Sequence, residues 1–230
     1  MHEVLELARR PCAHPLECNR QGLQEGEIEA INLLDSKTRP FLLNSRDNTV
    51  NKLVLTVGLL NYLTYAVVVR RHFSSATTPG AVRYGIIASC VGLAAFIYLM
   101  LRNEYTIAAL VAALAIFAAC LALFLWTATT TRSKRLRQAF DPGSPGPVVQ
   151  TGPYRYLRHP FYASYILFWL ACIVATLHPL MVIFLAAFGA LYLIAAYREE
   201  RSFETSPFAE EYKNYRKSTG LFWPKLALWA

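Results

Sequence analysis

The chain has 230 residues, of which 55% are hydrophobic, and a mean hydropathy of +0.30. The apolar residues are gathered into long runs, which is typical of an integral membrane protein. The formal net charge is +8, but the basic residues border the apolar runs, so anionic lipid headgroups explain them better than a nucleic acid does. We therefore expect membrane lipids, and no nucleic acid, as partners.

The five cysteines indicate neither a disulfide framework nor a metal site. Three of them lie inside apolar runs, where thiols behave as small hydrophobic groups. Cys12, His14 and Cys18 are close in sequence, but no second cluster completes the four ligands of a zinc site. We therefore expect no bound metal.

Residues 1–50 form the first of three regions that the sequence predicts. They are mixed polar sequence without the apolar core of a signal peptide. Within them, residues 27–34 predict a short amphipathic helix that lies on the membrane or caps the domain.

The second region, residues 51–127, contains three apolar runs and predicts three transmembrane helices. The first run contains Asn61, which needs a partner in hydrocarbon, so one face of this helix should contact protein. The third is rich in alanines spaced four apart, which allow close helix approach. The predicted spans are 53–69, 84–101 and 106–127.

The third region, residues 128–230, begins with a mostly polar connection at 128–150. Two apolar runs follow, 161–177 and 180–197, separated only by His178-Pro179. At about 1.5 Å per residue each reaches roughly 26 Å, close to the thickness of the hydrocarbon core. The two runs therefore predict an antiparallel transmembrane hairpin that returns the chain to its starting side.

Residues 152–162 read Gly-Pro-Tyr-Arg-Tyr-Leu-Arg-His-Pro-Phe-Tyr and precede this hairpin. Pro160 disfavours a helical conformation at His159, so we expect a helix to begin at Pro160. Arg155, Arg158 and His159 stand just before it, where a helix N-terminus attracts anions. The segment is interpreted either as a functional site or as a basic, aromatic collar that anchors a membrane helix.

The hairpin brings Arg155, Arg158 and His159 to the same membrane face as Glu199 and Glu200. Cationic and anionic groups from two distant segments can therefore share one site. Lys and Arg are concentrated in the loop before the hairpin and in the tail, which by the positive-inside tendency predicts that this site faces the cytoplasm.

The motif at 152–162, the hairpin, the Glu199-Glu200 pair and the aromatic tail together resemble the isoprenylcysteine carboxyl methyltransferase and phospholipid methyltransferase superfamily over about residues 128–224. The resemblance implies an all-α integral membrane fold with about five transmembrane helices. It also implies a cytoplasmic S-adenosylmethionine pocket, formed by the loop before the hairpin and by the C-terminal tail.

The resemblance also assigns residues. It implies a catalytic role for Glu199 and Glu200, and for Arg198 as the substitute for the family's substrate-side arginine. S-adenosylmethionine carries a cationic sulfonium and amine as well as a carboxylate, so its site needs both signs of charge. The residues implied to bind it are Val148, Val149, Tyr154, His159, Pro160, Tyr162 and Glu200.

The activity implied is methyl transfer to a lipophilic small molecule or lipidated substrate, foremost the carboxylate of an isoprenylcysteine-like molecule. A carboxylate needs only positioning and a cation such as Arg198. The first alternative is a phospholipid or other lipid amine, with Glu199 or Glu200 as the base that removes its proton. Two others are an NADPH-dependent membrane enzyme similar to sterol reductases and a non-enzymatic membrane protein.

Overall fold

The computed structural model describes residues 48–72, 80–103, 105–132 and 147–225. These residues belong to one compact unit, Asn44–Ala230. The helix expected at 27–34 and the cluster of Cys12, His14 and Cys18 lie outside the described residues.

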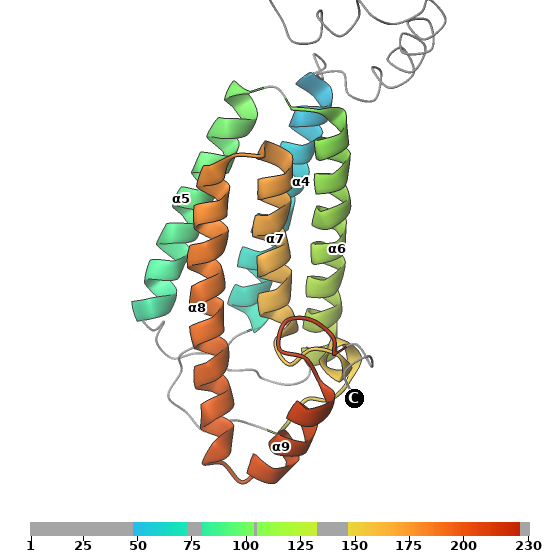
Figure 1. Cartoon of the computed structure of the whole chain (residues 1–230), viewed down its shortest axis with the longest axis vertical. Coiled ribbons are helices and arrows are strands. Elements are labelled where there is room, and N and C mark those ends of the chain that lie inside the picture. The colour runs from blue at the N-terminus through green and yellow to red at the C-terminus, as the bar shows by residue number, and fades with distance from the viewer. Residues whose placement is uncertain (1–47, 73–79, 104, 133–146, 226–230) are drawn as a thin grey trace, which may run out of the picture. The chain divides into compact units, whose positions relative to one another are not determined.

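The described residues form a helical bundle (Figure 1). They contain no β-strand, only one isolated parallel bridge between Leu157 and Gly220. The predicted all-helical class is therefore confirmed for this part of the chain. The helices are α4 (Asn48–His72), α5 (Gly80–Arg102), α6 (Ile107–Thr131), the short 3-10 helix η2 (Gly152–Arg155), α7 (Pro160–Thr176), α8 (Pro179–Glu204) and α9 (Ala209–Ser218).

Helices α4, α5, α6 and α8 are long and apolar enough to cross a membrane. Helix α7 is equally apolar in character but shorter, at 17 residues. Four of the five expected spans thus have the length and composition of a transmembrane helix, and a fifth span through α7 stays a prediction.

Helices α4, α5, α6 and α8 all extend beyond the predicted apolar runs, and the extensions of α6 and α8 lie closest to the candidate site. Helix α6 continues to Thr131, into the connection expected from residue 128, and the hydroxyl of Thr131 donates to the carbonyl of Thr127 at 2.9 Å. This bond lets a polar side chain remain on a helix in an apolar setting. Helix α8 continues past Tyr197 to Glu204, because Arg and Glu are good helix formers. Glu199 and Glu200 are therefore carried by a helix, not by a loop.

Helices α7 and α8 form the predicted antiparallel hairpin with its turn at residues 177–178, and its crossing of the membrane stays a prediction. Helix α7 ends at Thr176, and the next residue, Leu177, adopts a left-handed conformation with φ of 47°. Pro179 is the first residue of α8, a position where its missing N–H costs nothing. The ring nitrogen Nδ1 of His178 accepts a hydrogen bond from the Leu180 N–H at 3.1 Å, so His178 caps α8.

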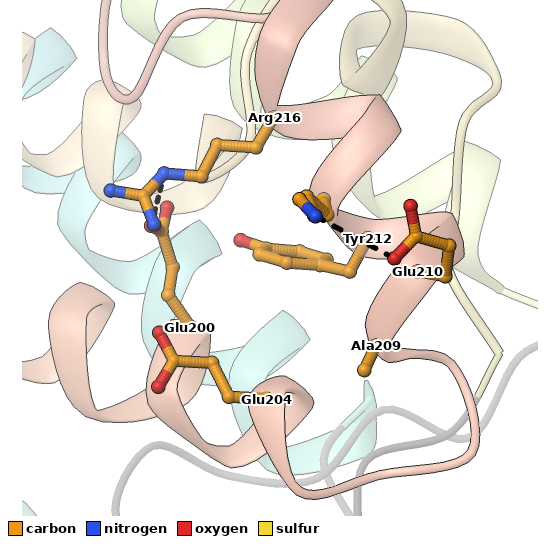
Figure 2. A pocket seen from close by; sticks show the side chains of 7 residues that line it. Glu200, Glu204, Ala209, Glu210, Tyr212 and Arg216 are labelled. Atoms are coloured by element: carbon orange, nitrogen blue, oxygen red, sulfur yellow. Dashed lines mark ion pairs between the residues drawn. The ribbon is translucent and has the colours of Figure 1, made fainter.

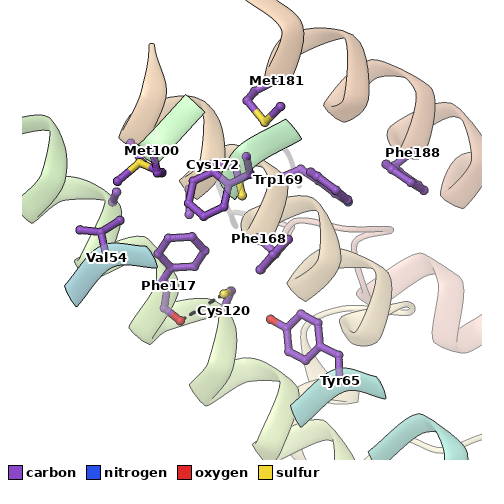
Figure 3. Close-up of a cluster of buried hydrophobic side chains, with 14 of the residues drawn as sticks. Val54, Tyr65, Met100, Phe117, Cys120, Phe168, Trp169, Cys172, Met181 and Phe188 are labelled. Atoms are coloured by element: carbon purple, nitrogen blue, oxygen red, sulfur yellow. Dashed lines mark hydrogen bonds between the residues drawn. The ribbon is translucent and has the colours of Figure 1, made fainter. Parts of the chain in front are cut away.

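Aromatic packing fills the centre of the bundle (Figure 3). Trp169 on α7 stacks on Phe188 of α8 with ring centroids 4.8 Å apart, and Phe168 contacts Phe117 of α6 edge-on at 5.6 Å. Asn61 is 1% exposed, donates to the Val57 carbonyl at 2.9 Å and accepts from the Cys120 thiol at 3.6 Å. The prediction that Asn61 faces protein is confirmed.

The antiparallel course of α7 and α8 places the beginning of one beside the end of the other. Figure 1 shows η2, the beginning of α7, the end of α8 and helix α9 gathered at the lower end of the bundle. The candidate site lies at this end.

Candidate active site

Two backbone constraints shape the segment before α7. Gly152 has φ of +59°, and a Cβ added there would lie 2.3 Å from the Thr130 hydroxyl oxygen, so only glycine fits against the end of α6. Pro160 begins α7, as predicted, and His159 before it is non-helical with φ of −127°. The polar residues 155–159 are thereby held at the entrance of α7.

Arg158 forms a buried ion pair with Glu200. Its Nε donates to Glu200 Oε1 at 2.6 Å, and the two side chains are only 9% and 4% exposed. A second donor of the same guanidinium, Nη1, binds the Thr219 carbonyl at 2.5 Å. Buried charges require such pairing, so this contact fixes the beginning of α7 against the end of α8.

His159 lies between the two carboxylates. Its Nδ1 is 3.4 Å from Glu199 Oε2, and its Nε2 is 3.4 Å from Glu200 Oε1. Burial alone would lower the pKa of His159, but the hydrogen bonds and charges of Glu199 and Glu200 outweigh it and raise the pKa above its usual value. The imidazolium is therefore favoured here.

Aromatic rings surround Glu199. The Tyr162 hydroxyl donates to Glu199 Oε1, and the Tyr162 ring stacks on His159 on one side and on Tyr192 on the other, each at 5.5 Å between centroids. Burial raises the pKa of Tyr154, and the charge of nearby Glu199 raises it further. The carboxylate thus stands among flat rings, a combination that suits a cationic ligand.

The other oxygen of Glu200, Oε2, is buried and has no hydrogen-bond partner among the described residues. Arg216 is the nearest cation, with its Nε 3.7 Å away. Figure 2 shows Arg216 and Tyr212 of α9 pointing toward Glu200 of α8. A cavity of about 360 Å³ lies here, lined by Glu200, Glu204, Ala209, Glu210, Tyr212, Lys213 and Arg216.

The structure brings Arg158 and His159 to Glu199 and Glu200, as the sequence predicted, and Tyr162 also contacts Glu199. That Tyr154, His159, Tyr162 and Glu200 bind a cofactor stays a prediction. The segment before α7 also meets the tail, since the Tyr215 hydroxyl of α9 donates to the Tyr154 carbonyl at 2.6 Å. The hairpin therefore joins the two segments that the expected pocket requires.

The remaining predicted residues lie around this centre. Val149 and Pro160 are buried and Val148 is half-buried. Arg198 is exposed on α8, two residues before Glu200. Of all the predicted site residues, only Glu200 lines the cavity between α8 and α9. A pocket lined by the residues from 148 to 162 stays a prediction.

Sequence reasoning placed Arg158 near the carboxylates but gave it no role, and it missed Arg216 and Phe222. The ring of Phe222 lies edge-on to His159 at 6.2 Å. Nothing local in the sequence indicates this contact, because it depends on how the chain after α9 turns back toward η2.

The described residues form a helical bundle with four helices long and apolar enough to cross a membrane and with a charged site at one end, which fits an integral membrane protein. Residues 108–211 match the family model of phospholipid methyltransferase, so this region of the chain is similar to that family, which is part of the superfamily named above. The match covers α6 to the beginning of α9, and it starts earlier than the predicted resemblance. Searches of the curated proteins and of the solved structures gave no match. This similarity favours a membrane methyltransferase.

Proposed function

We propose that the protein is an integral membrane methyltransferase that uses S-adenosylmethionine and acts on a lipophilic acceptor. One observation carries the proposal. Inside the segment that matches the family, the hairpin brings Arg158, His159 and Tyr162 into contact with Glu199 and Glu200.

The donor set fits the cofactor. When bound, S-adenosylmethionine supplies a methyl group on a positively charged sulfur. Glu199 and the stacked rings of Tyr162 and Tyr192 would attract that charge, since carboxylates and neutral aromatic faces both favour cations. Glu200 Oε2, buried without a hydrogen-bond partner in the described part of the chain, would accept from an amine or hydroxyl of the ligand.

For the acceptor we propose the carboxylate of an isoprenylcysteine-like molecule. Both glutamates are already engaged: Glu200 pairs with Arg158, and Glu199 accepts from Tyr162. Neither is poised to remove a proton. A carboxylate is ionised at neutral pH and needs no base, so the methyl group can pass to its oxygen while the carbon–sulfur electron pair stays on sulfur. Arg198 is the proposed cation that holds it.

A lipid amine is the second candidate, favoured by the family description, phospholipid methyltransferase. An ammonium group must lose a proton before it can accept a methyl group. Glu199, with 37% of its side chain exposed, is the more accessible of the two possible bases.

Labelled methyl transfer decides between the acceptors. The purified protein in lipid vesicles receives S-adenosylmethionine labelled in its methyl group, with either N-acetyl-S-farnesylcysteine or phosphatidylethanolamine. We expect label in a base-labile ester of the cysteine compound. Label in the phospholipid headgroup would establish the second candidate. Binding of NADPH without binding of S-adenosylmethionine would instead favour a reductase, and binding of neither a non-enzymatic protein.

The carboxylates have their own test. We expect Glu200→Gln to weaken S-adenosylmethionine binding by about 1 to 3 kcal/mol, because it removes one charge at nearly constant size. Calorimetric titration measures this, with Glu199→Gln in parallel. Unchanged affinity in both variants would remove the carboxylates from the site.

We also propose that the site faces the cytoplasm, because Lys and Arg are concentrated at this end of the bundle. Ser218, the exposed last residue of α9, is the position to label. A cysteine placed there should resist an impermeant thiol reagent in intact cells and react after lysis. Reaction from outside would reverse the orientation.

A further inference from the structure

The chain after α9 lies along the segment that precedes α7, although the family match ends at residue 211. We call residues 219–222 the strap. Its main chain pairs with residues 156–159 in the manner of a short parallel ladder. The bonds run from the Arg158 N–H to the Gly220 carbonyl (2.8 Å), from the His159 N–H to the Leu221 carbonyl (3.2 Å) and from the Gly220 N–H to the Tyr156 carbonyl (3.1 Å).

Side chains and sterics fix the strap in one conformation. Thr219 is 2% exposed, and its carbonyl accepts from the buried guanidinium of Arg158 at 2.5 Å. A Cβ on Gly220 would lie 1.6 Å from the Trp223 carbonyl oxygen, so the following turn requires glycine. Arg158 thus holds both Glu200 and the strap through two donors of one planar group.

The strap ends in Phe222, whose ring completes an aromatic corner. It lies edge-on to His159 at 6.2 Å and to Tyr162 at 6.4 Å, with interplanar angles of 73° and 83°. His159 and Tyr162 both contact the carboxylate of Glu199. Rings and carboxylate thus converge from α7, α8 and the strap.

We propose that the strap completes the cofactor site, with Phe222 as a binding residue that favours the positively charged sulfonium of S-adenosylmethionine over the neutral thioether of its product, S-adenosylhomocysteine. Arg158 is the positioning residue that holds the strap in place. The proposal rests on the proposed function. An aromatic ring attracts a cation and has no such attraction for a neutral sulfur, so Phe222 would help the site to exchange product for fresh cofactor.

The test compares affinities for the charged and the neutral ligand in the purified full-length protein. We expect Phe222→Leu, which keeps an apolar side chain but removes the ring, to weaken S-adenosylmethionine binding about five- to tenfold. Binding of S-adenosylhomocysteine should change less than about twofold. Phe222→Tyr should retain both affinities. Trp223→Leu is the matched control, since Trp223 is the next residue and is 61% exposed.

The outcomes separate this inference from the proposed function. If Phe222→Leu binds S-adenosylmethionine as the wild type does, or loses both ligands equally, the role of Phe222 is overturned and the proposed function stands. If the wild type binds no S-adenosylmethionine, both are overturned.

Arg158→Lys tests the positioning role. Lysine keeps the charge, but a single ammonium cannot reproduce the fork that binds Glu200 and the Thr219 carbonyl. We expect faster hydrogen exchange at the Gly220 amide and a loss of ligand selectivity in the same direction as in Phe222→Leu. Unchanged exchange at Gly220 would overturn the role of Arg158.

Discussion

The apolar bundle and its charged end are held together in different ways. In the bundle, rings such as Trp169 and Phe188 pack over large areas, and no single contact decides the arrangement. At the charged end, the single guanidinium of Arg158 joins Glu200 on α8 to the carbonyl of Thr219 after α9, and Arg216 of α9 adds a longer contact to Glu200. The first region should tolerate changes that conserve volume, whereas the second should fail when one specific donor is lost.

The largest effect is expected for Arg158→Ala, which removes the shortest ion-pair contact of the buried Glu200 and leaves it only the longer contacts to His159 and Arg216, at 3.4 and 3.7 Å. Such a loss costs about 3 to 5 kcal/mol of unfolding free energy. Denaturant unfolding of the purified variants in detergent measures it. The double variant Arg158→Leu with Glu200→Leu should recover much of this stability, because it removes both charges, but not the binding of S-adenosylmethionine. Wild-type stability of Arg158→Ala would show that this end is not held by the ion pair.

A loss of turnover, at least about a hundredfold, is expected for His159→Ala, because it removes the group between Glu199 and Glu200. Arg155→Ala is the matched control. It also removes a cationic group from the same short segment, but Arg155 is exposed and its loss should mainly affect anchoring at the membrane. Turnover is measured at saturating cofactor and acceptor. If the Arg155 variant folds but has no turnover, while the His159 variant keeps wild-type turnover, the role assigned to His159 is wrong.

A smaller effect is expected in the bundle. Phe168→Leu keeps an apolar side chain of similar size and should cost about 1 kcal/mol of unfolding free energy. Its affinity for S-adenosylmethionine should equal that of the wild type. Calorimetric titration beside denaturant unfolding checks both, and a large loss of affinity without a loss of stability would erase the distinction between the two regions.

The smallest effect is a pH dependence from His159. Its pKa is higher in the folded protein than in the unfolded chain, because the hydrogen bonds and charges of Glu199 and Glu200 outweigh burial. The protonated ring therefore contributes stability that is fully present below its unfolded pKa and is lost as pH rises through the folded value. The Tm difference between wild type and His159→Gln should shrink as pH rises above neutrality. A difference that grows with pH would contradict the raised pKa.

The sequence predicted the bundle better than the details of its ends. The apolar runs indicate the lengths of the helices, and the His178-Pro179 break indicates where the chain reverses. The hairpin could therefore be predicted, and with it the contact of Arg158 and His159 with the two glutamates. The C-terminal ends of α6 and α8 could not be predicted in this way. The hydroxyl of Thr131 donates a hydrogen bond to a carbonyl of its own helix, so this polar residue does not end α6. The charged residues after Tyr197 are compatible with a helix as well as with an irregular tail.

Non-local contacts explain what else the sequence left open. The strap is bound by main-chain groups of residues 156–159, and main-chain groups carry no residue-specific signal. The cavity between α8 and α9 depends on the angle at which α9 turns back after Glu204. Neither the spacing nor the type of Arg216 and Tyr212 indicates that angle.

The hairpin turn at Leu177 and His178 determines how α8 is rotated about its own axis relative to α7. One residue deleted from α8 between Pro179 and Glu199 would move the two carboxylates by only about 1.5 Å along the axis, a shift that a bilayer accommodates easily. It would also rotate them by about 100°. Glu200 would then leave Arg158, and Glu199 would leave Tyr162. The rotation of the two carboxylates about the helix axis therefore fixes the number of residues between Pro179 and Glu199. This constraint is far tighter than the one that membrane thickness imposes.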